Sequence, residues 1–398
     1  MRFPSTCLRF RCFKYTFHLG LLFLVTVIFM FTAKQWTLPQ GGTPTIHPLS
    51  TVLPERQNHS KRASEFKILI WNVGKRMQRR FLRSFGATEK DPFKYCSVRN
   101  CELEVNNDKI GEASAVMFHL HLTEGPHKLP PYHRADQDWI FFTDESPLHT
   151  FLRTRKYRMS DYNGIFNLSM TYRSDSDIPV PYGRTVRLSP EQRTAVGQQR
   201  NFAAKKTGLV AILGSNCGGA NRRWDYVHEL EKYIQVDIYG GCGKKNVCPG
   251  HFTRDCDVVK DYKFYLAFEN SNCREYITEK LWWNAYAKEV VPVVMGGSKS
   301  DYEKLCPPMS FIHVEDFESP RDLAAYLKAL DADDVAYNAY FRWKKKYRVL
   351  NEHGYFGSPS LHLCRICEKL NVPNRLRKVY SDLDSFWNAS RDCRKPVW

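Results

Sequence analysis

Short runs of apolar residues recur along the chain from residue 66 onward. In the first half they are FKILIW at 66–71, the run at 115–122 and WIFF at 139–142. An apolar run of four to eight residues without strict alternation is typical of a strand that is buried on both faces. The stretches between these runs are long enough to hold helices. The pattern therefore predicts strand–helix units and a sheet covered on both sides.

The second half of the chain shows the same alternation more regularly. It follows residues 184–207, which carry six Arg and Lys residues and few large apolar side chains. The strands are expected at 208–213, 234–239, 262–268, 290–295 and 311–315, and the helices near 221–233, at 275–287 and at 320–330. This order is typical of a doubly wound α/β domain.

The length of 398 residues also favours two domains over one, because a single core rarely grows that large. We therefore expect one Rossmann-like domain at 65–195 and a second at 205–370. No element is predicted for the C-terminal extension at 371–398.

The N-terminal segment has the pattern of a membrane anchor. Residues 16–33 read TFHLGLLFLVTVIFMFTA, and as a helix they would extend about 27 Å, close to the thickness of a bilayer core. No Ala-x-Ala pattern follows, which argues against a cleaved signal peptide. Basic residues are concentrated before this run, so the positive-inside rule predicts a cytoplasmic tail at 1–15. The Pro-, Thr- and Ser-rich residues 34–64 are expected to form a stem, with the remainder in a lumen.

Composition adds two constraints. Eleven of the 13 cysteines follow the expected anchor, so in an oxidising lumen at least one of them cannot pair within the chain. The 59 Lys and Arg residues against 42 Asp and Glu give a net charge of +17, which suits a nucleic acid, an anionic membrane or a phosphorylated small molecule. The basic residues are spread along the chain without a nucleic-acid-binding motif, so no nucleic-acid partner is expected.

The junction after the run at 262–268 is the best candidate for a functional site. Ligands of open parallel sheets bind beyond the carboxyl ends of the strands. A helix opening near Glu275 would bring Tyr276, Glu279 and Lys280 onto one face at spacings of i, i+3 and i+4. Spacing alone leaves two interpretations open, a phosphate site at a helix N-terminus and a solvated ion pair on a surface helix.

The sequence YKFYLAFENSNCREYITEKLWWNAY, followed by VPVVMGG, resembles the donor-site signature of the α1,3/α1,4-fucosyltransferases, and most closely that of the invertebrate members. The similarity extends to FIHVEDF at 311–317 and to YRSDSDIPVPYG at 172–183, and covers most of residues 65–370. The resemblance implies a GT-B fold, in which two Rossmann-like domains face a cleft. The N-terminal domain would bind the acceptor and the C-terminal domain GDP-fucose.

The resemblance also implies roles for individual residues. Those expected to contact GDP-fucose are Asn270, Tyr276, Glu279 and Lys280, with Arg223 favoured over Arg222 for the diphosphate. Glu145, in the Asp-Glu-Ser-Pro element that follows WIFF, is expected to be the catalytic base, with Asp144 as the neighbouring alternative. A carboxylate such as Glu279 near the sugar would favour an oxocarbenium-like transition state.

The implied activity is inverting transfer of L-fucose to the 3-hydroxyl of a GlcNAc on glycoprotein glycans, by a type II Golgi membrane enzyme. No metal site and no obligatory cofactor are expected, while stimulation by a divalent cation and a homodimer are left open. The choice between the N-glycan core and LacNAc or LacdiNAc is also left open. The alternative is a catalytically inactive Golgi protein of the same fold that binds a GDP-sugar or a glycan.

Two further motifs receive structural interpretations. Asp175-Ser176-Asp177 has the form of a metal-binding Asp-x-Asp, but it lies within the fucosyltransferase-like element and is not expected to hold a metal. Cys364 and Cys367 are expected to form a disulfide with each other, because no second Cys-x-x-Cys lies at zinc-like spacing and because family members carry a similar pair. A similar pairing of Cys242 with Cys248 is considered, although connectivity cannot be read from sequence.

Overall fold

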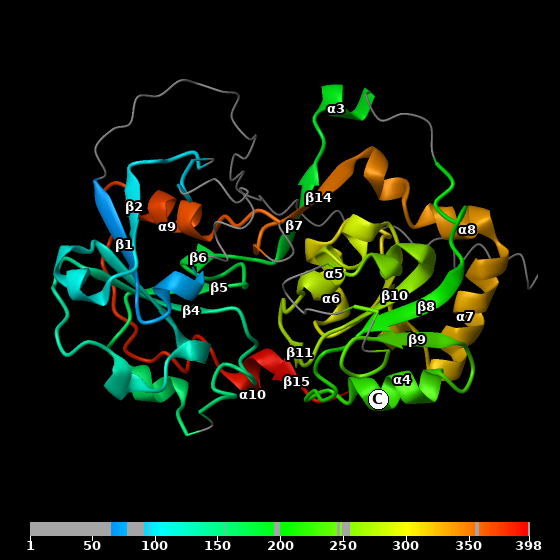
Figure 1. The fold of residues 1–398 in the computed structure, drawn as a ribbon, viewed down its shortest axis with the longest axis horizontal. Helices are drawn as coiled ribbons and strands as arrows, with labels where there is room; N and C mark the ends of the chain where they lie inside the picture. The colour runs from blue at the N-terminus through cyan, green and yellow to red at the C-terminus, as the bar shows by residue number, and fades with distance from the viewer. Residues whose placement is uncertain are drawn as a thin grey trace, which may run out of the picture. The chain divides into compact units, whose positions relative to one another are not determined.

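The computed structural model describes residues 65–77, 91–94, 96–154, 156–194, 200–244, 247–248, 255–354 and 358–396. No helix within these ranges combines the length and the apolar character needed to cross a membrane. The expected tail at 1–15 and the anchor at 16–33 lie outside the described residues, as does the stem at 34–64. The described residues form a six-stranded sheet, a five-stranded sheet and two two-stranded ribbons. The two larger sheets can be followed in Figure 1.

The first sheet has six parallel strands in the order β2-β1-β3-β4-β5-β6. The strands are β1 (Phe66–Ile70), β2 (Cys101–Glu104), β3 (Ala115–His119), β4 (Asp138–Thr143), β5 (Leu168–Thr171) and β6 (Ile178–Pro179). Alternate side chains of β1, β3 and β4 enter different cores, as the two-residue period of a strand requires. In β4, Ile140 and Phe142 pack in one core, whereas Trp139 and Phe141 pack in the other. Burial on both faces explains the continuous apolar runs in the sequence.

The second sheet has five parallel strands in the order β13-β12-β10-β8-β9. The strands are β8 (Gly208–Leu213), β9 (Val236–Tyr239), β10 (Tyr262–Phe268), β12 (Val291–Met295) and β13 (Ile312–His313), and the associated helices are α4 (Arg223–Leu230), α5 (Glu279–Trp282), α6 (Lys299–Leu305), α7 (Pro320–Ala332) and α8 (Asp334–Ala339). One face packs on α4 and α7 through an apolar core. All five strands expected in this sheet form. Strands β8 and β10 have the expected bounds, and the other three are shorter than expected by one to three residues in total.

Both sheets have the doubly wound strand order, because in each the first strand lies between the second and the third. Ligand sites in such sheets lie where the strand order reverses, beyond the carboxyl ends of the strands. In the second sheet this point lies between β8 and β10. The loops that follow these two strands, 214–222 and 269–278, therefore flank the expected donor site.

The chain returns from the second sheet to the first through β14 (Tyr347–Asn351) and α9 (His362–Leu370). Strand β14 pairs antiparallel with β7 (Gly183–Arg187), and α9 then packs on the first sheet. Figure 1 shows α9 beside β1 and β2. The range 205–370 expected for the second domain thus includes a helix that packs with the first sheet. Helix α3 (Pro190–Thr194) lies in the segment between the sheets.

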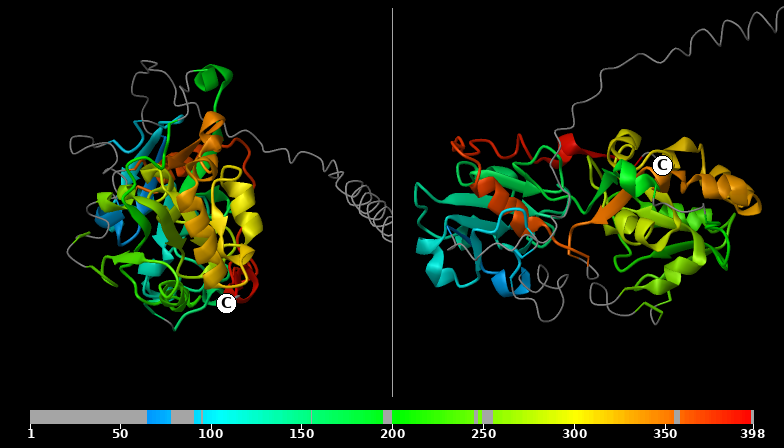
Figure 2. Two further views of the ribbon diagram at one scale, coloured as in Figure 1. Left: turned by 90° about the vertical axis from the view of Figure 1, so that its right-hand side faces the viewer. Right: turned by 90° about the horizontal axis from the view of Figure 1, so that it is seen from above.

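The C-terminal extension, for which the sequence predicted no element, folds against both sheets. It contains α10 (Ala389–Asp392) and β15 (Cys393–Arg394), and β15 pairs with β11 (Asn272–Cys273) next to the donor loop. Its red trace in Figure 2 runs beside the first sheet before it reaches the second. Trp387 is completely buried and donates its indole N–H to the Thr150 hydroxyl at 2.9 Å.

The disulfides correct the expected Cys364–Cys367 pairing and the pairing considered for Cys242 and Cys248. Cys364 and Cys367 pair with Cys96 and Cys101 rather than with each other, and thereby attach α9 to the first sheet. Adjacent turns of a helix direct these two side chains at different partners. Cys242 and Cys248 also pair elsewhere, in Cys217–Cys242 and Cys248–Cys256. The fifth disulfide joins Cys273 to Cys393, and Cys306 is the one unpaired, buried cysteine among the described residues.

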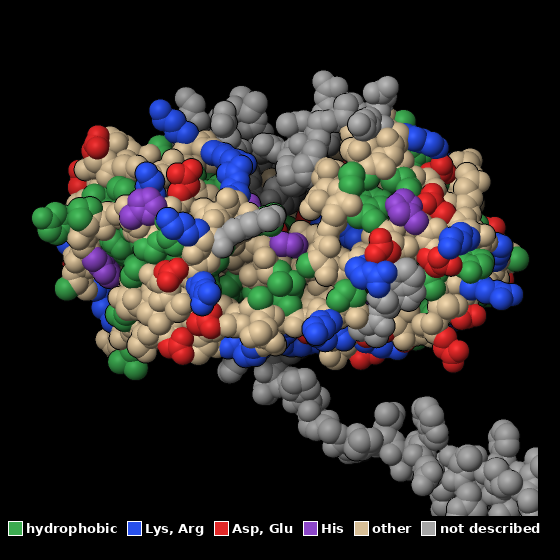
Figure 3. Space-filling view, turned by 90° about the horizontal axis from the view of Figure 1, so that it is seen from below, with side chains coloured by type: hydrophobic (Ala, Val, Ile, Leu, Met, Phe, Trp, Pro, Cys, Tyr) green, Lys and Arg blue, Asp and Glu red, His purple; other side chains and the backbone are tan. Residues whose placement is uncertain are grey.

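Charged side chains are intermixed on the surface. On the face shown in Figure 3, Lys and Arg side chains are scattered among Asp and Glu side chains rather than gathered in one patch. The net charge of +17 is therefore not concentrated on that face.

Candidate active site

The donor loop, residues 269–278, begins with a carboxylate that is completely buried. Glu269 follows β10, and its side chain accepts hydrogen bonds from the Thr278 backbone N–H at 2.7 Å and from the Thr278 hydroxyl at 2.9 Å. These bonds close the loop on itself. Gly296, which follows β12, lies so close that a Cβ there would be 2.7 Å from Glu269 Cγ, and its φ of +155° is open to glycine.

Lys280 provides the positive charge beside Glu269. Its ammonium group lies 3.1 Å from Glu269 Oε2, 3.3 Å from Glu279 Oε1 and 2.9 Å from the Thr278 hydroxyl. Burial lowers the pKa of Lys280, but the two carboxylates outweigh burial and raise it overall. Burial likewise raises the pKa of Glu279, and the adjacent Lys280 charge outweighs this effect and lowers it overall. Both groups are therefore ionised at neutral pH.

The local backbone differs from the helix predicted at 275–287. Helix α5 begins only at Glu279, with Thr278 as its N-cap residue, and Glu275 adopts a left-handed φ of 56°. Tyr276 precedes the helix, so it does not share a helical face with Glu279 and Lys280. The tertiary contacts of Glu275 explain the difference, because its carboxylate accepts hydrogen bonds from the Ser174 hydroxyl at 2.8 Å and from Lys304 at 2.8 Å.

The two candidate arginines lie in different environments. Arg223 is 5% exposed and donates to the carbonyl oxygens of Phe268 at 2.9 Å, Asn216 at 2.7 Å and Gly218 at 3.1 Å. These bonds occupy three of the five guanidinium N–H groups and fix the loop after β8 to the end of β10. Arg222 caps α4, is largely exposed and pairs with Asp225 at 2.8 Å. Of the two arginines, Arg223 is therefore the one that joins the loop after β8 to the end of β10.

Glu145 follows β4 of the first sheet and meets the donor loop directly. The Tyr276 hydroxyl donates to Glu145 Oε2 at 3.2 Å. Burial and the neighbouring Asp144 charge raise the pKa of Glu145, while His121, Lys280 and the Tyr276 bond oppose this effect in part. A half-buried carboxylate with a raised pKa is suited to accept a proton from a substrate hydroxyl.

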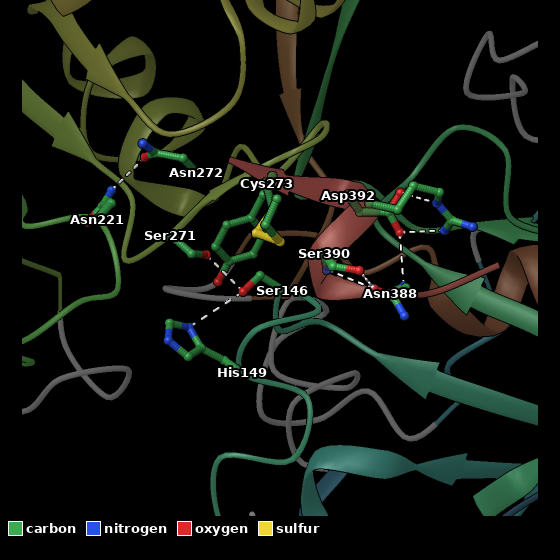
Figure 4. The surroundings of a disulfide bond; sticks show 12 residues. Ser146, His149, Asn221, Ser271, Asn272, Cys273, Asn388, Ser390 and Asp392 are labelled. Carbon is green, nitrogen blue, oxygen red and sulfur yellow. Dashed lines mark hydrogen bonds and ion pairs between the residues drawn. A yellow bond between two sulfur atoms is a disulfide. The ribbon is translucent and has the colours of Figure 1, made fainter. Parts of the chain in front are cut away.

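A second contact joins the same two loops. Ser271 of the donor loop donates to the Ser146 hydroxyl at 2.8 Å, and Ser146 lies 3.5 Å from the Nδ1 of His149. Figure 4 shows Ser271 and Ser146 pointing toward each other, close to Cys273. The Ser271 hydroxyl also lies 3.1 Å from Asn270 Oδ1, which places Asn270 at this junction.

The sequence matches two family profiles. The N-terminal fucosyltransferase profile matches residues 63–183, and the C-terminal profile of glycosyltransferase family 10 (fucosyltransferase) matches residues 203–387. Among curated proteins, a 3-galactosyl-N-acetylglucosaminide 4-alpha-L-fucosyltransferase from Bos taurus is 41% identical over 285 residues, which cover 71% of this chain and 73% of the bovine protein. The chain belongs to glycosyltransferase family 10.

Other comparisons agree with this family. A Drosophila melanogaster protein, glycoprotein 3-alpha-L-fucosyltransferase A, is 38% identical over 309 residues. The match spans 76% of this chain and 57% of the fly protein. A crystal structure of α1,3-fucosyltransferase with GDP-fucose shares the fold at 18% identity and a TM-score of 0.50, covering 83% of this chain and 96% of that one.

In this family 10 chain, the structure places Tyr276 against Glu145 and Lys280 against Glu279, and the Lys280 charge also acts on Glu145. Glu269 was not predicted as a site residue, although the sequence shows a carboxylate at the first position after a buried strand. Ser146 was also missed. Its contact with Ser271 joins the loops of the two sheets, and no local pattern marks it.

The carboxylates of Asp175 and Asp177 pair with different side chains, which are cations and a hydroxyl group. Asp175 pairs with Arg173 and Arg274, whereas Asp177 accepts from the Tyr380 hydroxyl at 2.7 Å and lies 2.8 Å from Lys378. In the part of the chain that the structure describes, no group of three or more His, Cys, Asp or Glu side chains is arranged to hold a metal ion. The Asp-x-Asp triplet thus contributes to packing between the first sheet, the donor loop and the C-terminal extension.

Proposed function

We propose that this protein is an inverting α-(1,3)-fucosyltransferase that moves L-fucose from GDP-β-L-fucose to a GlcNAc of glycoprotein glycans. The two doubly wound sheets would form a GT-B arrangement, with the donor bound beyond β8 and β10 and the acceptor beyond β3 and β4. The observation that carries the proposal is the hydrogen bond from Tyr276 to Glu145, which joins the donor loop to a raised-pKa carboxylate of the first sheet.

Glu145 supplies the base in the proposed reaction. The acceptor 3-hydroxyl attacks the anomeric carbon of fucose as its proton passes to a Glu145 carboxylate oxygen. The bond from the anomeric carbon to the β-phosphate oxygen breaks, and its electron pair leaves with GDP. Attack opposite the leaving group converts the β-linked donor into an α-linked product. A raised pKa increases the driving force for this proton transfer, provided that the carboxylate is ionised at the working pH.

The donor side supplies the charge for departure of GDP. Lys280 and the remaining N–H groups of Arg223 would stabilise the negative charge that develops on the phosphate oxygen. Glu279 remains ionised because its pKa is lowered, so it can favour positive charge at the fucosyl carbon. These cationic side chains make a resident metal unnecessary for the proposed step.

The proposal includes a cellular setting. Residues 16–33 would anchor the chain in the Golgi membrane as a single-pass type II protein with the two sheets in the lumen. The five disulfides support this setting, because disulfides persist in oxidising compartments. GDP-fucose and GlcNAc-containing glycoproteins would be its substrates. A homodimer and stimulation by a divalent cation remain separate experimental questions.

A mass measurement tests the proposal. The full chain, purified in mild detergent, would be incubated with GDP-fucose and two acceptors, a core N-glycan glycopeptide and a LacdiNAc glycan. A gain of one deoxyhexose on either acceptor supports the proposal and identifies the acceptor class. GDP binding without transfer to a panel of GlcNAc-containing glycans would instead favour the inactive GDP-sugar-binding alternative.

A further inference from the structure

Asp144, the residue before Glu145, lies in a buried cluster that the proposed reaction does not use. One carboxylate oxygen lies 3.3 Å from His119 Nε2, and the other lies 3.5 Å from His353 Nε2. The exposed fractions of these side chains are 9% for Asp144, 4% for His119 and 2% for His353. Two imidazoles therefore bracket one carboxylate where water is largely excluded.

The three residues come from separate parts of the fold and are held rigidly. His119 ends β3 and packs edge-on against Phe142, with a ring separation of 4.7 Å. His353 follows β14 and stacks on Tyr182 at 3.7 Å. The Tyr182 hydroxyl donates to the Asp144 carbonyl oxygen at 2.7 Å, so the same tyrosine holds both the histidine and the backbone beside the base.

The charged and titratable groups around the cluster divide into two sets. Asp144 faces His119, His353 and the Tyr182 phenol. The second set surrounds Glu145 and consists of Asp144, His121, Lys280 and the Tyr276 phenol. Asp144 is the member common to both, because it pairs with the buried histidines and its charge also acts on Glu145.

We propose that Asp144 is a positioning residue that acts on the reaction through Glu145, with His119 and His353 setting how much negative charge stands beside the base. The inference rests on the proposed function, because it assigns the cluster to the base of that reaction. When the imidazoles carry a proton, they neutralise Asp144 and Glu145 releases its proton more readily. When the imidazoles are neutral, the Asp144 charge is less compensated and Glu145 holds its proton more tightly.

Two substitutions should move the pH profile in opposite directions. Asp144→Asn removes the neighbouring charge, so the acidic limb of kcat/KM should move to lower pH by about one unit. His353→Phe keeps the aromatic ring on Tyr182 but removes the nitrogen that faces Asp144. With one imidazole fewer beside it, the Asp144 carboxylate should then move the acidic limb to higher pH. Affinity for GDP, measured by calorimetry, should remain unchanged in both variants.

The double variant Asp144→Asn/His353→Phe provides the decisive comparison. If His353 acts through the Asp144 charge, His353→Phe should produce no further shift once that charge is gone. His362→Gln is the matched control, because His362 lies 4.7 Å from the His353 ring and its Nδ1 lies 2.9 Å from the Ser360 hydroxyl. This substitution should leave the acidic limb in place.

The outcomes separate failure of this inference from failure of the proposed function. Transfer of fucose by the unmodified chain with shifts of the same sign in both single variants would overturn the inference alone. An unchanged limb in Asp144→Asn, or an equal His353→Phe shift in both backgrounds, would also overturn it. No transfer by the unmodified chain at any pH would overturn the proposed function.

Discussion

Glu145 and Glu279 lie on the two sides of the candidate active site, and their surroundings shift their pKa values in opposite directions. Burial and Asp144 raise the pKa of Glu145, whereas for Glu279 the Lys280 charge outweighs burial and lowers it. Two carboxylates with separated pKa values can take different roles at one pH. In the proposed reaction, this difference suits Glu145 to accept a proton and Glu279 to keep a negative charge.

The two sides also differ in how they are built. The donor side takes Glu269, Thr278, Glu279 and Lys280 from twelve consecutive residues, held by local hydrogen bonds and ion pairs. The surroundings of Glu145 come from segments far apart in the chain, including Tyr276 and the cluster around Asp144. Substitutions within the donor loop should therefore change donor binding. Substitutions in the distant segments that surround Glu145 should instead change the pKa of Glu145.

The largest effect is expected from Glu145→Gln, which keeps the size of the side chain but removes the proton acceptor. Turnover should fall by about 10²- to 10⁴-fold, the usual contribution of a general base. Affinity for GDP should change little, because the donor-side charges remain. Initial rates with GDP-fucose, together with calorimetry of GDP binding, would test this expectation. Near-normal turnover would show that another group takes the proton.

The control for this substitution is Glu191→Gln in α3. Glu191 is fully exposed, so its replacement should affect neither turnover nor GDP binding.

The second effect concerns the anchoring of the donor loop. Replacing both Cys273 and Cys393 with serine removes a cross-link between residues 120 positions apart. Chain entropy alone predicts a loss of up to about 5 kcal/mol in the free energy of unfolding. The loss is smaller to the extent that the other disulfides already restrict the unfolded chain. Denaturant unfolding would measure the loss, and weaker GDP binding would show that the cross-link also positions the donor loop.

Cys248 and Cys256 provide the matched comparison, because their disulfide spans a separation of only 8 residues. The same entropy argument predicts about 2.5 kcal/mol for this pair. A greater loss from the Cys248–Cys256 pair than from Cys273–Cys393 would contradict the anchoring role of the longer cross-link.

The third effect is expected from Lys280→Met. The substitution removes a charged partner of the diphosphate and leaves the buried Glu269 without its cation. GDP affinity should fall by roughly 10- to 100-fold, the value of one or two charge-assisted hydrogen bonds. Isothermal titration with GDP would measure it, and Lys280→Arg should recover part of the loss.

Lys232→Met is the control, because its ammonium group pairs with Glu229 on the exposed surface of α4. GDP affinity and the free energy of unfolding should both stay at the values of the unmodified chain. Unaltered GDP affinity in Lys280→Met would place the diphosphate away from the donor loop.

The smallest effect is a displacement of the pH profile. Since the pKa of Glu145 is raised from 4.5, the base should lose its charge as the pH falls through a value above 4.5. Glu279, with its lowered pKa, should remain ionised in that range. The acidic limb of kcat/KM should therefore lie above pH 4.5, and the residual rate of Glu145→Gln should lack it. A limb at or below 4.5 would contradict the raised pKa.

The sequence by itself predicted the five strands of the second sheet and β1, β3 and β4 of the first, because strands buried on both faces require continuous apolar runs. The short strands β2, β5 and β6 were not predicted. It also indicated the donor loop as the candidate site, because the candidate side chains there are neighbours along the chain. The helix expected at 275–287 did not form as predicted. The left-handed Glu275, whose carboxylate bonds to Ser174 and Lys304, delays the start of α5 until Glu279.

Only the tertiary structure decided which cysteines pair and what surrounds Glu145. Cys364 and Cys367 are three residues apart on α9, yet the packing of that helix on the first sheet directs them to Cys96 and Cys101. In the same way, His353 reaches Asp144 because β14 pairs with β7 and returns the chain toward the first sheet. The pattern of residues along the chain shows only how far apart they are in the sequence. The pKa of a carboxylate depends on every charge that folding brings near it, so it requires the tertiary structure.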